Sequence, residues 1–412
     1  MDQDKIHMLI EQIKLELNEN ILSFWVKYGL DDVHGGFIGR MHNNRQIQTQ
    51  APKGLILNSR LLWTFSAAYR VTQNKLYLDI AQLAYQYLNA NFFDTEFGGY
   101  YWMLDYQGNA LDDKKKIYGQ AFSLYALSEY YRAHPDPEIL KQAEQLFGLI
   151  EEHSFDKQYG GYFEAYERNW ALAEDLRLSD IDMNEKKSMN THLHILEAYT
   201  NLFRVWPSEL VGQRIELLLN LFAEHIIDSE SSHFKLFFDE AWHSKTNRIS
   251  YGHDIEGSWL LYEAAEVLGQ DELKTTFGQW ALRMAEAVLQ EGIQPDGSIV
   301  YEKGPGNHVD TDRHWWPQAE SAVGFLNAYQ LSGDEAYLGA SQKAWSYILA
   351  QIVDHEYGEW VWRVNEEGRL YQEDWKVSEW KGPYHNARAC MELMHRYQAL
   401  LKQDNKTPVV QN

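Results

Sequence analysis

Apolar residues recur at positions i, i+3, i+4 and i+7 along most of the chain, which is the spacing of amphipathic helices. Short links that contain Pro, Gly or Asp, such as residues 133–138 and 331–335, join these helices in pairs. The pattern predicts twelve helices, over residues 4–28, 53–72, 77–92, 117–133, 137–153, 188–205, 209–227, 252–269, 271–290, 313–332, 335–352 and 383–402. We therefore expect an all-α protein built from helical hairpins.

A turn motif recurs between the helices, about every 62 residues in the first half of the chain. Three segments share an Asp, a ring residue at the fourth place, Gly-Gly and a second ring: DDVHGGF (31–37), DTEFGGY (94–100) and DKQYGGY (156–162). A fourth segment, DHEYGEW (354–360), has Glu359 in place of the second Gly. The motif marks a structural repeat.

Two weaker segments, 234–242 and 295–302, are expected to fill the interval before the fourth motif, once an insertion near 167–187 is allowed for. This makes six units. Six hairpins, each too short to bury its apolar face alone, can stack in a line or close into a ring, and a ring removes the two exposed ends. We expect an (α/α)6 toroid, or barrel, with the glycine-rich segments as short β-turns or hairpins at one end.

No Ser/Gly/Pro-rich linker interrupts the series, so residues 1–403 are expected to form a single domain and residues 404–412 a disordered tail. Asp and Glu number 60 against 37 Lys and Arg, a net charge of -23 that disfavours binding to nucleic acid or anionic membranes. No window approaches the roughly 20 apolar residues of a membrane span. The single cysteine, Cys390, excludes a disulfide framework and fits a cytoplasmic protein.

The chain is rich in aromatic residues, with 15 Trp and 26 Tyr. Such rings pack in cores and also serve as flat platforms for sugars. In the expected ring, one helix of each pair faces the cavity, namely those that begin near 53, 117, 188, 252, 313 and 383. Polar residues interrupt the apolar face near the start of all six: Arg60, Tyr118, Asn190, His192, His194, His253, Glu256, His314, Glu320, His385, Asn386 and Arg388. Six elements that contribute polar groups to one end of one cavity indicate a functional site.

The spacing of these residues limits their chemistry. His192 and His194 point about 200° apart on a helix and cannot share a metal ion, so we expect no metal site there. His194 shares a face with Asn190 and Glu197, and we expect it to point inward. His253 and Glu256 are three residues apart, so the carboxylate is expected to hold the imidazole in one tautomer.

No GxGxxG, P-loop or GxSxG motif occurs, so no nucleotide or nicotinamide cofactor is expected. Cys390, on the last inner helix, fits a small buried residue better than a nucleophile.

Five segments in this order and at these intervals resemble the N-acylglucosamine 2-epimerase superfamily and, within it, the cellobiose 2-epimerases. They are SRLLW (59–63), MNTHLHILEAY (189–199), YGHDIEGSWLL (251–261), HWWPQAESAVGF (314–325) and EWKGPYHNARACME (379–392). The resemblance runs from about residue 8 to 400. It implies an (α/α)6 barrel and the cofactor-free inversion of C2 in a reducing-end sugar, a small-molecule substrate; oligomeric state is left open.

The resemblance also implies roles for single residues. His253 and His385 match the acid/base pair that removes and returns the C2 proton, and His194 and Arg60 match the groups that polarise the carbonyl and hold the enediolate. The remaining matches are the carboxylates that orient the two imidazoles, Glu256 and Glu320, the sugar-contacting Tyr118 and Asn190, and the stacking rings Trp316 and Trp380.

The sequence departs from the disaccharide epimerases at Gly382, where Cys is frequent, and this leaves the shape of the nearby loop open. Relatives that act on free mannose share the histidines, but the long loop 292–312 and the Trp380 segment favour a disaccharide such as cellobiose. N-acylated amino sugars are a further alternative.

A glycoside hydrolase would use Glu256 and Glu320 astride a glycosidic bond and leave two inward histidines idle. A non-catalytic sugar-binding protein would use the rings alone. An enediolate can also be reprotonated at C1, so some aldose–ketose isomerisation is expected.

Overall fold

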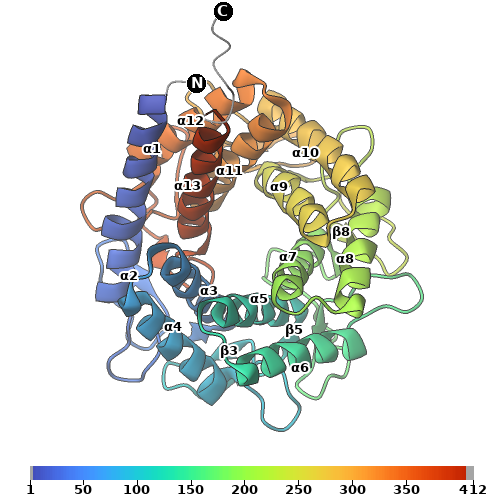
Figure 1. Cartoon of the computed structure of the whole chain (residues 1–412). Helices are drawn as coiled ribbons and strands as arrows, with labels where there is room; N and C mark the ends of the chain where they lie inside the picture. The colour runs from blue at the N-terminus through green and yellow to red at the C-terminus, as the bar shows by residue number, and fades with distance from the viewer. Residues whose placement is uncertain (1–2, 405–412) are drawn as a thin grey trace, which may run out of the picture.

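The computed structural model describes residues 3–404, in which the helices form two concentric rings (Figure 1). The inner ring consists of α3 (Leu55–Thr72), α5 (Ile117–Ala133), α7 (Met189–Val205), α9 (Tyr251–Leu268), α11 (Trp315–Ser332) and α13 (Tyr384–Asp404). The outer ring consists of α4 (Lys75–Tyr87), α6 (Pro137–His153), α8 (Glu209–Leu221), α10 (Asp271–Glu291), α12 (Glu335–Tyr347) and the N-terminal run of α1 (Gln3–Leu15), η1 (Glu16–Leu22) and α2 (Ser23–Tyr28). The prediction of an (α/α)6 toroid is confirmed. Residues 405–412, most of the expected disordered tail, lie outside the described residues.

The ring closes where α1 packs beside α13, so the first and last helices of the chain form one hairpin pair (Figure 1). Three outer helices end in a π-helical turn, in which the backbone is wider than in an α-helix. These turns are η2 (Leu88–Phe92), η3 (Phe222–Ile226) and η5 (Ile348–Ile352), and each leads into a turn of the repeat. The π-helical η1 lies instead within the N-terminal run, between α1 and α2. No described helix is both long and apolar enough to span a membrane.

The repeated turn is fixed by a buried ion pair. In the second unit, Asp94 accepts a backbone hydrogen bond from Gly98 and donates one to Gly99, both at 2.9 Å. The two glycines have φ values of 73° and 71°, which residues with a Cβ rarely adopt. Lys115 then donates to the Asp94 carboxylate at 2.9 Å and ties the turn to the strand before the next inner helix. The same pair recurs as Asp31–Lys53, Asp156–Lys187 and Asp354–Lys376.

The fourth unit differs from the sequence prediction. Its turn spans residues 228–234, before the segment 234–242 in which we expected it, and Asp228 makes the same two backbone hydrogen bonds as Asp94. Ser232, with φ of 65°, and His233 replace the two glycines. The motif is invisible in the sequence because a serine takes the left-handed conformation. The fifth turn lies between the bridged Ile293 and Ile299, within the expected region.

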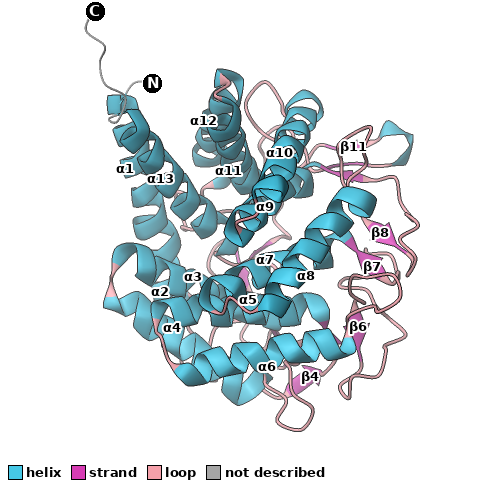
Figure 2. Ribbon diagram, turned by 45° about the vertical axis from the view of Figure 1, so that its right-hand side comes forward, coloured by secondary structure: helices cyan, strands magenta, loops and turns pink. Residues whose placement is uncertain are grey.

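Short antiparallel strands lie directly before each of the first five inner helices and set where it begins. The pairs are β1 (Met41–His42) with β14 (Trp375–Val377), β2 (Lys53–Gly54) with β3 (Met103–Leu104) and β4 (Ala110–Asp112), β5 (Lys115–Lys116) with β6 (Ala165–Tyr166), β7 (Lys187–Ser188) with β8 (Phe237–Phe238), β9 (Ile249–Ser250) with β10 (Glu302–Lys303) and β11 (Val309–Asp310), and β12 (Arg313–His314) with β13 (Arg363–Val364). A 3₁₀ turn, η4 (Pro305–Asn307), joins β10 to β11. Figure 2 shows the strands gathered along one side of the ring, which is the predicted arrangement.

The inner helices share one register, and it decides which side chains face the cavity. The fourth residue of a helix turns outward and accepts a hydrogen bond from a repeat turn: Gln120 from Tyr100 N (2.8 Å), His192 from Tyr162 N (2.9 Å), Asp254 from Phe234 N (2.8 Å) and Gln318 from Ile299 N (2.9 Å). The sixth residue lies about 200° away and faces inward. This explains why His192 is structural and His194 points to the cavity, as predicted.

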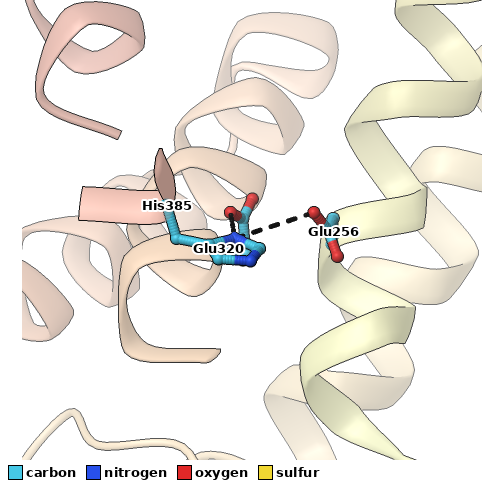
Figure 3. A group of neighbouring side chains, drawn as sticks. All are labelled: Glu256, Glu320 and His385. Atoms are coloured by element: carbon cyan, nitrogen blue, oxygen red, sulfur yellow. Dashed lines mark hydrogen bonds and ion pairs between the residues drawn. The ribbon is translucent and has the colours of Figure 1, made fainter. Parts of the chain in front are cut away.

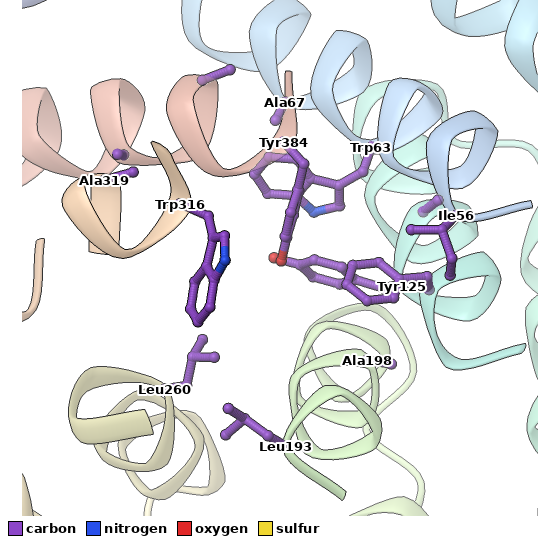
Figure 4. Packing of buried hydrophobic residues seen from close by; sticks show 14 of the residues in the cluster. Ile56, Trp63, Ala67, Tyr125, Leu193, Ala198, Leu260, Trp316, Ala319 and Tyr384 are labelled. Atoms are coloured by element: carbon purple, nitrogen blue, oxygen red, sulfur yellow. The ribbon is translucent and has the colours of Figure 1, made fainter. Parts of the chain in front are cut away.

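Aromatic side chains from α3, α5 and α13 pack together inside the ring (Figure 4). Trp63 lies 5.2 Å from Tyr384 and 5.3 Å from Tyr125, measured between ring centroids. Trp63 and Tyr125 are one helical turn beyond the sixth residues of α3 and α5, and Tyr384 is the first residue of α13. The polar side chains of the cavity therefore adjoin a layer of buried aromatic rings.

Candidate active site

A cavity of about 610 Å³ lies where the inner helices begin. The resemblance implied roles for ten residues, and nine of them line this cavity: Arg60, Tyr118, Asn190, His194, His253, Glu256, Trp316, Trp380 and His385. The tenth, Glu320, lies behind His385 and is 1% exposed. The inner helices therefore bring together nine of the ten predicted residues, and Trp380 reaches the cavity from the loop before α13.

Arg60 is a buried cation with neutral neighbours. Its guanidinium donates to the Trp380 carbonyl at 3.1 Å and to the Tyr118 hydroxyl at 3.0 Å, and its Nε has no partner. Within residues 3–404 no carboxylate forms an ion pair with it. A buried charge is costly unless it is paired, so Arg60 is suited to hold an anionic oxygen of a ligand.

His385 is oriented by a carboxylate, as Figure 3 shows. Its Nδ1 lies 2.7 Å from Glu320 Oε1 and 3.9 Å from Glu256 Oε1. Arg388, one turn along α13, donates from the same nitrogen to Glu256 at 2.6 Å and to Glu320 at 2.7 Å. Trp259 completes the shell by donating to Glu320 at 3.1 Å. These contacts leave Nε2 of His385 for a ligand.

The contact expected between Glu256 and His253 does not form. Nδ1 of His253 is instead 2.8 Å from the hydroxyl of Ser250, the residue directly before α9. Glu256 turns toward Arg388, because a full positive charge attracts the carboxylate more strongly than a neutral imidazole does. The sequence analysis was therefore wrong about the group that orients His253, and it overlooked Ser250.

His194 belongs to the same buried network. Its Nδ1 lies 2.8 Å from Glu197, and Glu197 also accepts hydrogen bonds from Arg388 and from the Tyr384 hydroxyl. Arg388 thus binds three carboxylates from three inner helices, Glu197, Glu256 and Glu320. A continuous chain of contacts joins the His194 imidazole to that of His385.

Burial sets the protonation of the network. It lowers the pKa of His253 to about 3 and, with the positive charges of Arg60 and Arg388, lowers the pKa of His385 well below its usual value. Both imidazoles are therefore neutral near pH 7. Burial and the neighbouring Glu320 raise the pKa of Glu256 above its usual value, whereas Arg388 and His194 outweigh burial at Glu197 and lower its pKa to about 2.

Glu256, Glu320 and His385 place ligating atoms within 4.8 Å of one another, a spacing that a metal ion could bridge. The Arg388 guanidinium already occupies both carboxylates, and its fixed positive charge opposes a second cation. These side chains therefore fit an arginine-centred network better than a metal site.

Aromatic rings enclose the histidines. The centroid of Trp316 lies 4.7 Å from that of His253 and 5.6 Å from that of His385, so both imidazoles pack against one indole. Trp380 lies 6.0 Å from Tyr118 on the opposite side, and Asn190 keeps a buried, unpartnered Oδ1. At Gly382, the departure from the expected motif, a Cβ would lie 2.7 Å from Leu57 Cδ1, so a larger residue there would require the Leu57 side chain to shift.

The insertion noted in the sequence also lines the cavity. Residues from Leu176 to Glu185 form part of the wall, and Lys116 holds this segment by donating to the carbonyls of Arg177 (2.8 Å) and Leu178 (3.3 Å). No periodic pattern runs through the insertion, so its position could not be predicted from the sequence.

Comparisons with known proteins identify relatives of the whole chain. Residues 36–389 match the sequence model of the N-acylglucosamine 2-epimerase (GlcNAc 2-epimerase) family. The chain is 46% identical to the cellobiose 2-epimerase of Bacteroides fragilis over 388 residues, 94% of this chain and 99% of the relative, and 39% identical to that of Ruminococcus albus over 390 residues, again 94% and 99%.

Among solved structures, the cellobiose 2-epimerase from Bacillus thermoamylovorans B4167 superposes with a TM-score of 0.91 at 41% identity, covering 95% of this chain and all of that one. Fold, sequence model and nearly full-length relatives thus agree. The chain belongs to the N-acylglucosamine 2-epimerase family.

Proposed function

We propose that this protein is a carbohydrate 2-epimerase, an isomerase that inverts C2 of the reducing-end sugar of β-1,4-linked disaccharides and converts cellobiose to glucosyl-mannose. The observation that carries the proposal is the packing of two neutral imidazoles, His253 and His385, against Trp316, beside the unpaired cation Arg60. Relatives named cellobiose 2-epimerase, similar over almost their whole length, support the substrate class.

The reaction starts from the open-chain aldehyde, in which C2–H lies next to a carbonyl. One imidazole takes the C2 proton, the C–H electron pair forms the C1=C2 double bond, and the carbonyl π pair moves to O1. The other histidine, neutral in the resting site, takes up a proton from solvent once the enediolate has formed and delivers it to the opposite face of C2, and the electrons restore the carbonyl. Exchange with solvent resets both rings. The step involves no net oxidation, so it needs no redox cofactor.

The developing oxyanion needs fixed donors, and Arg60 and His194 are placed to supply them. Nδ1 of His194 donates to the Glu197 carboxylate, and this carboxylate stabilises the imidazolium form of the ring, in which Nε2 can donate to the substrate oxygen. Donors of this kind contribute most in a site that excludes water, and Arg60 is only 4% exposed. Tyr118 and Asn190 are assigned to the sugar hydroxyls, and Trp316 and Trp380 to the sugar faces.

The arrangement of the carboxylates speaks against a glycoside hydrolase. Such enzymes need two carboxyl groups about 5 to 9.5 Å apart on either side of a glycosidic bond. Glu256 and Glu320 instead bind the same nitrogen of Arg388 and are each 1% exposed. One ligating oxygen of each lies within 4.8 Å of the other and of His385, which leaves no room for a sugar between them.

The test is proton NMR of the purified protein with cellobiose in D2O, without added metal or nucleotide, beside tubes with mannose and N-acetylglucosamine. We expect deuterium to enter C2 of the reducing glucose while a mannose-configured product grows, and we expect His385→Ala to abolish both signals. Reaction of mannose or N-acetylglucosamine alone would move the substrate to that sugar. Cleavage of cellobiose, or no exchange in any tube, would overturn the proposal.

A further inference from the structure

His314 is a buried polar residue that the proposed mechanism does not use. It ends β12, directly before α11, and lines the cavity two residues ahead of Trp316. The side chain is 92% buried, being 8% exposed, and its ring lies flat on Tyr301 with centroids 3.9 Å apart and planes 14° apart. Neither ring nitrogen has a hydrogen-bond partner among the described residues, and Nε2 is fully buried.

The equivalent residues of other units behave differently. Lys116, Ser188 and Ser250 also stand directly before an inner helix. Lys116 donates to Arg177 O, Ser188 accepts from Thr191 N at 3.1 Å, and Ser250 binds His253. Each has a partner within the protein, whereas His314 has none. Leaving a buried polar group without a hydrogen bond destabilises a protein, so an unpartnered imidazole in the wall of a ligand cavity indicates a ligand partner.

The ring of His314 is neutral. Burial and the nearby Arg363 lower its pKa to about 3. A neutral imidazole offers one N–H donor and one acceptor, which suits a sugar hydroxyl that can both accept and donate. The stack on Tyr301 fixes the plane of the ring, so little conformational entropy is lost when a hydroxyl binds.

The position of His314 identifies which sugar it meets. The reacting C1 and C2 atoms must lie at His253 and His385, which pack against Trp316 near the start of the inner helices. In a β-1,4 disaccharide the second sugar is attached at C4, at the far end of the reducing unit. That sugar therefore extends away from the helices toward the strand side, where β12 carries His314.

We propose that His314 is a specificity-determining residue that hydrogen-bonds a hydroxyl of the non-reducing sugar of the disaccharide. This inference rests on the proposed function, since it requires a disaccharide in the cavity. It predicts that His314 contributes to the binding of cellobiose and leaves proton transfer at C2 of a free monosaccharide unchanged.

The test compares the wild type with His314→Phe, which keeps the stack on Tyr301 but removes both nitrogens. The substrates are cellobiose, free glucose at high concentration, and cellobiose analogues that each lack one hydroxyl of the non-reducing sugar. We expect His314→Phe to lower kcat/KM for cellobiose about tenfold, mainly through KM, with C2 deuterium exchange of glucose unchanged. One deoxy analogue should react equally with both proteins, which identifies the partner hydroxyl.

Two further variants serve as controls. His314→Gln keeps a donor and an acceptor, so it should recover part of the kcat/KM for cellobiose that His314→Phe loses. Such a recovery would show that the lost hydrogen bond, and not a folding defect, lowers the activity of His314→Phe. His42 also packs against an aromatic ring, that of Trp375, with centroids 4.1 Å apart, but it does not line the cavity. His42→Phe should therefore leave kcat/KM for cellobiose unchanged. An unchanged kcat/KM for cellobiose, or an equal loss with glucose and with every analogue, would overturn the role of His314. Failure of the wild type on all disaccharides would instead overturn the proposed function.

Discussion

The hydroxyl of Ser250 lies 2.8 Å from Nδ1 of His253 and orients that imidazole from the position directly before α9. The other proposed acid/base, His385, is held by the carboxylate of Glu320 at 2.7 Å. A hydroxyl fixes the plane of a ring without adding charge, whereas a carboxylate also stabilises the protonated imidazole. The two histidines thus have supports of different chemistry, although both pack against Trp316.

Ser250→Ala should lower kcat/KM for cellobiose roughly tenfold, because loss of one hydrogen bond of about 1 kcal/mol lets the His253 ring rotate. Ser250→Thr keeps the hydroxyl and should retain most of the activity. Steady-state kinetics with the C2 exchange rate checks this. Equal rates for the alanine and wild-type proteins would mean that another group orients His253.

Arg60→Lys should lower kcat about a hundredfold, with a smaller change in KM. A lysine ammonium is a single point charge and cannot bind Trp380 O and the Tyr118 hydroxyl while it also faces an oxyanion. Arg204→Lys is the matched control, because Arg204 pairs with Glu263 near the far end of α7, away from the cavity. A loss confined to KM would show that Arg60 binds the ground state and the transition state equally.

Arg388→Met should destabilise the fold by about 3–5 kcal/mol and abolish turnover, since it leaves buried carboxylates without their cation. Urea denaturation followed by tryptophan fluorescence measures the change. Arg396→Met, two turns further along α13, removes a guanidinium that binds Glu392 and neutral amides, and it should cost clearly less. Similar losses for both variants would contradict a central role for Arg388.

Much of this architecture could be predicted from the sequence because it depends on local periodicity. The apolar spacing i, i+3, i+4 and i+7 predicted the helices, and the repeated Asp and Gly motif located four of the turns. The inward residues followed from one register, in which residues two apart, such as His192 and His194, face opposite sides. A repeat in sequence becomes a ring of equivalent positions, so one correct assignment fixes the others.

Contacts between units could not be predicted in this way. The spacing of three residues predicted a contact between Glu256 and His253. Glu256 instead binds Arg388, which lies more than a hundred residues later in the chain, so its position could not be inferred from local spacing. The turn at 228–234 was displaced in the prediction because Ser232 takes a glycine conformation. The wall formed by the insertion depends on hydrogen bonds from Lys116 to backbone carbonyls, which carry no side-chain signal.

The two neighbouring histidines of α7 should separate structure from chemistry. His192→Ala removes the acceptor for Tyr162 N and the contact with Ser188 O, so it should lower the unfolding midpoint. His194→Ala should leave the midpoint closer to that of the wild type but lower kcat about a hundredfold, because one oxyanion donor is lost. Thermal unfolding and kinetics on both variants check the assignment, and the opposite pattern would reverse the inward and outward faces.

Glu164 should make the stability of the fold depend on pH. Its carboxylate, 4% exposed, accepts from Ser188 N at 2.6 Å and contacts the Thr191 hydroxyl at 2.5 Å. Burial outweighs these hydrogen bonds and raises its pKa from 4.5 to about 8. Between these values the folded state binds more protons than the unfolded chain, so the stability from this group is complete below pH 4.5 and is lost as the pH rises through 8.

Glu164→Gln mimics the protonated side chain and cannot ionise, so its free energy of unfolding should fall less steeply than that of the wild type between about pH 5 and 9. Urea denaturation at intervals across this range measures both slopes. Glu167→Gln removes the same charge from an exposed position three residues later and should keep the wild-type slope. If Glu164→Gln also kept that slope, Glu164 would be ionised throughout, and the start of α7 would hold a buried carboxylate stabilised by the amide and hydroxyl donors alone.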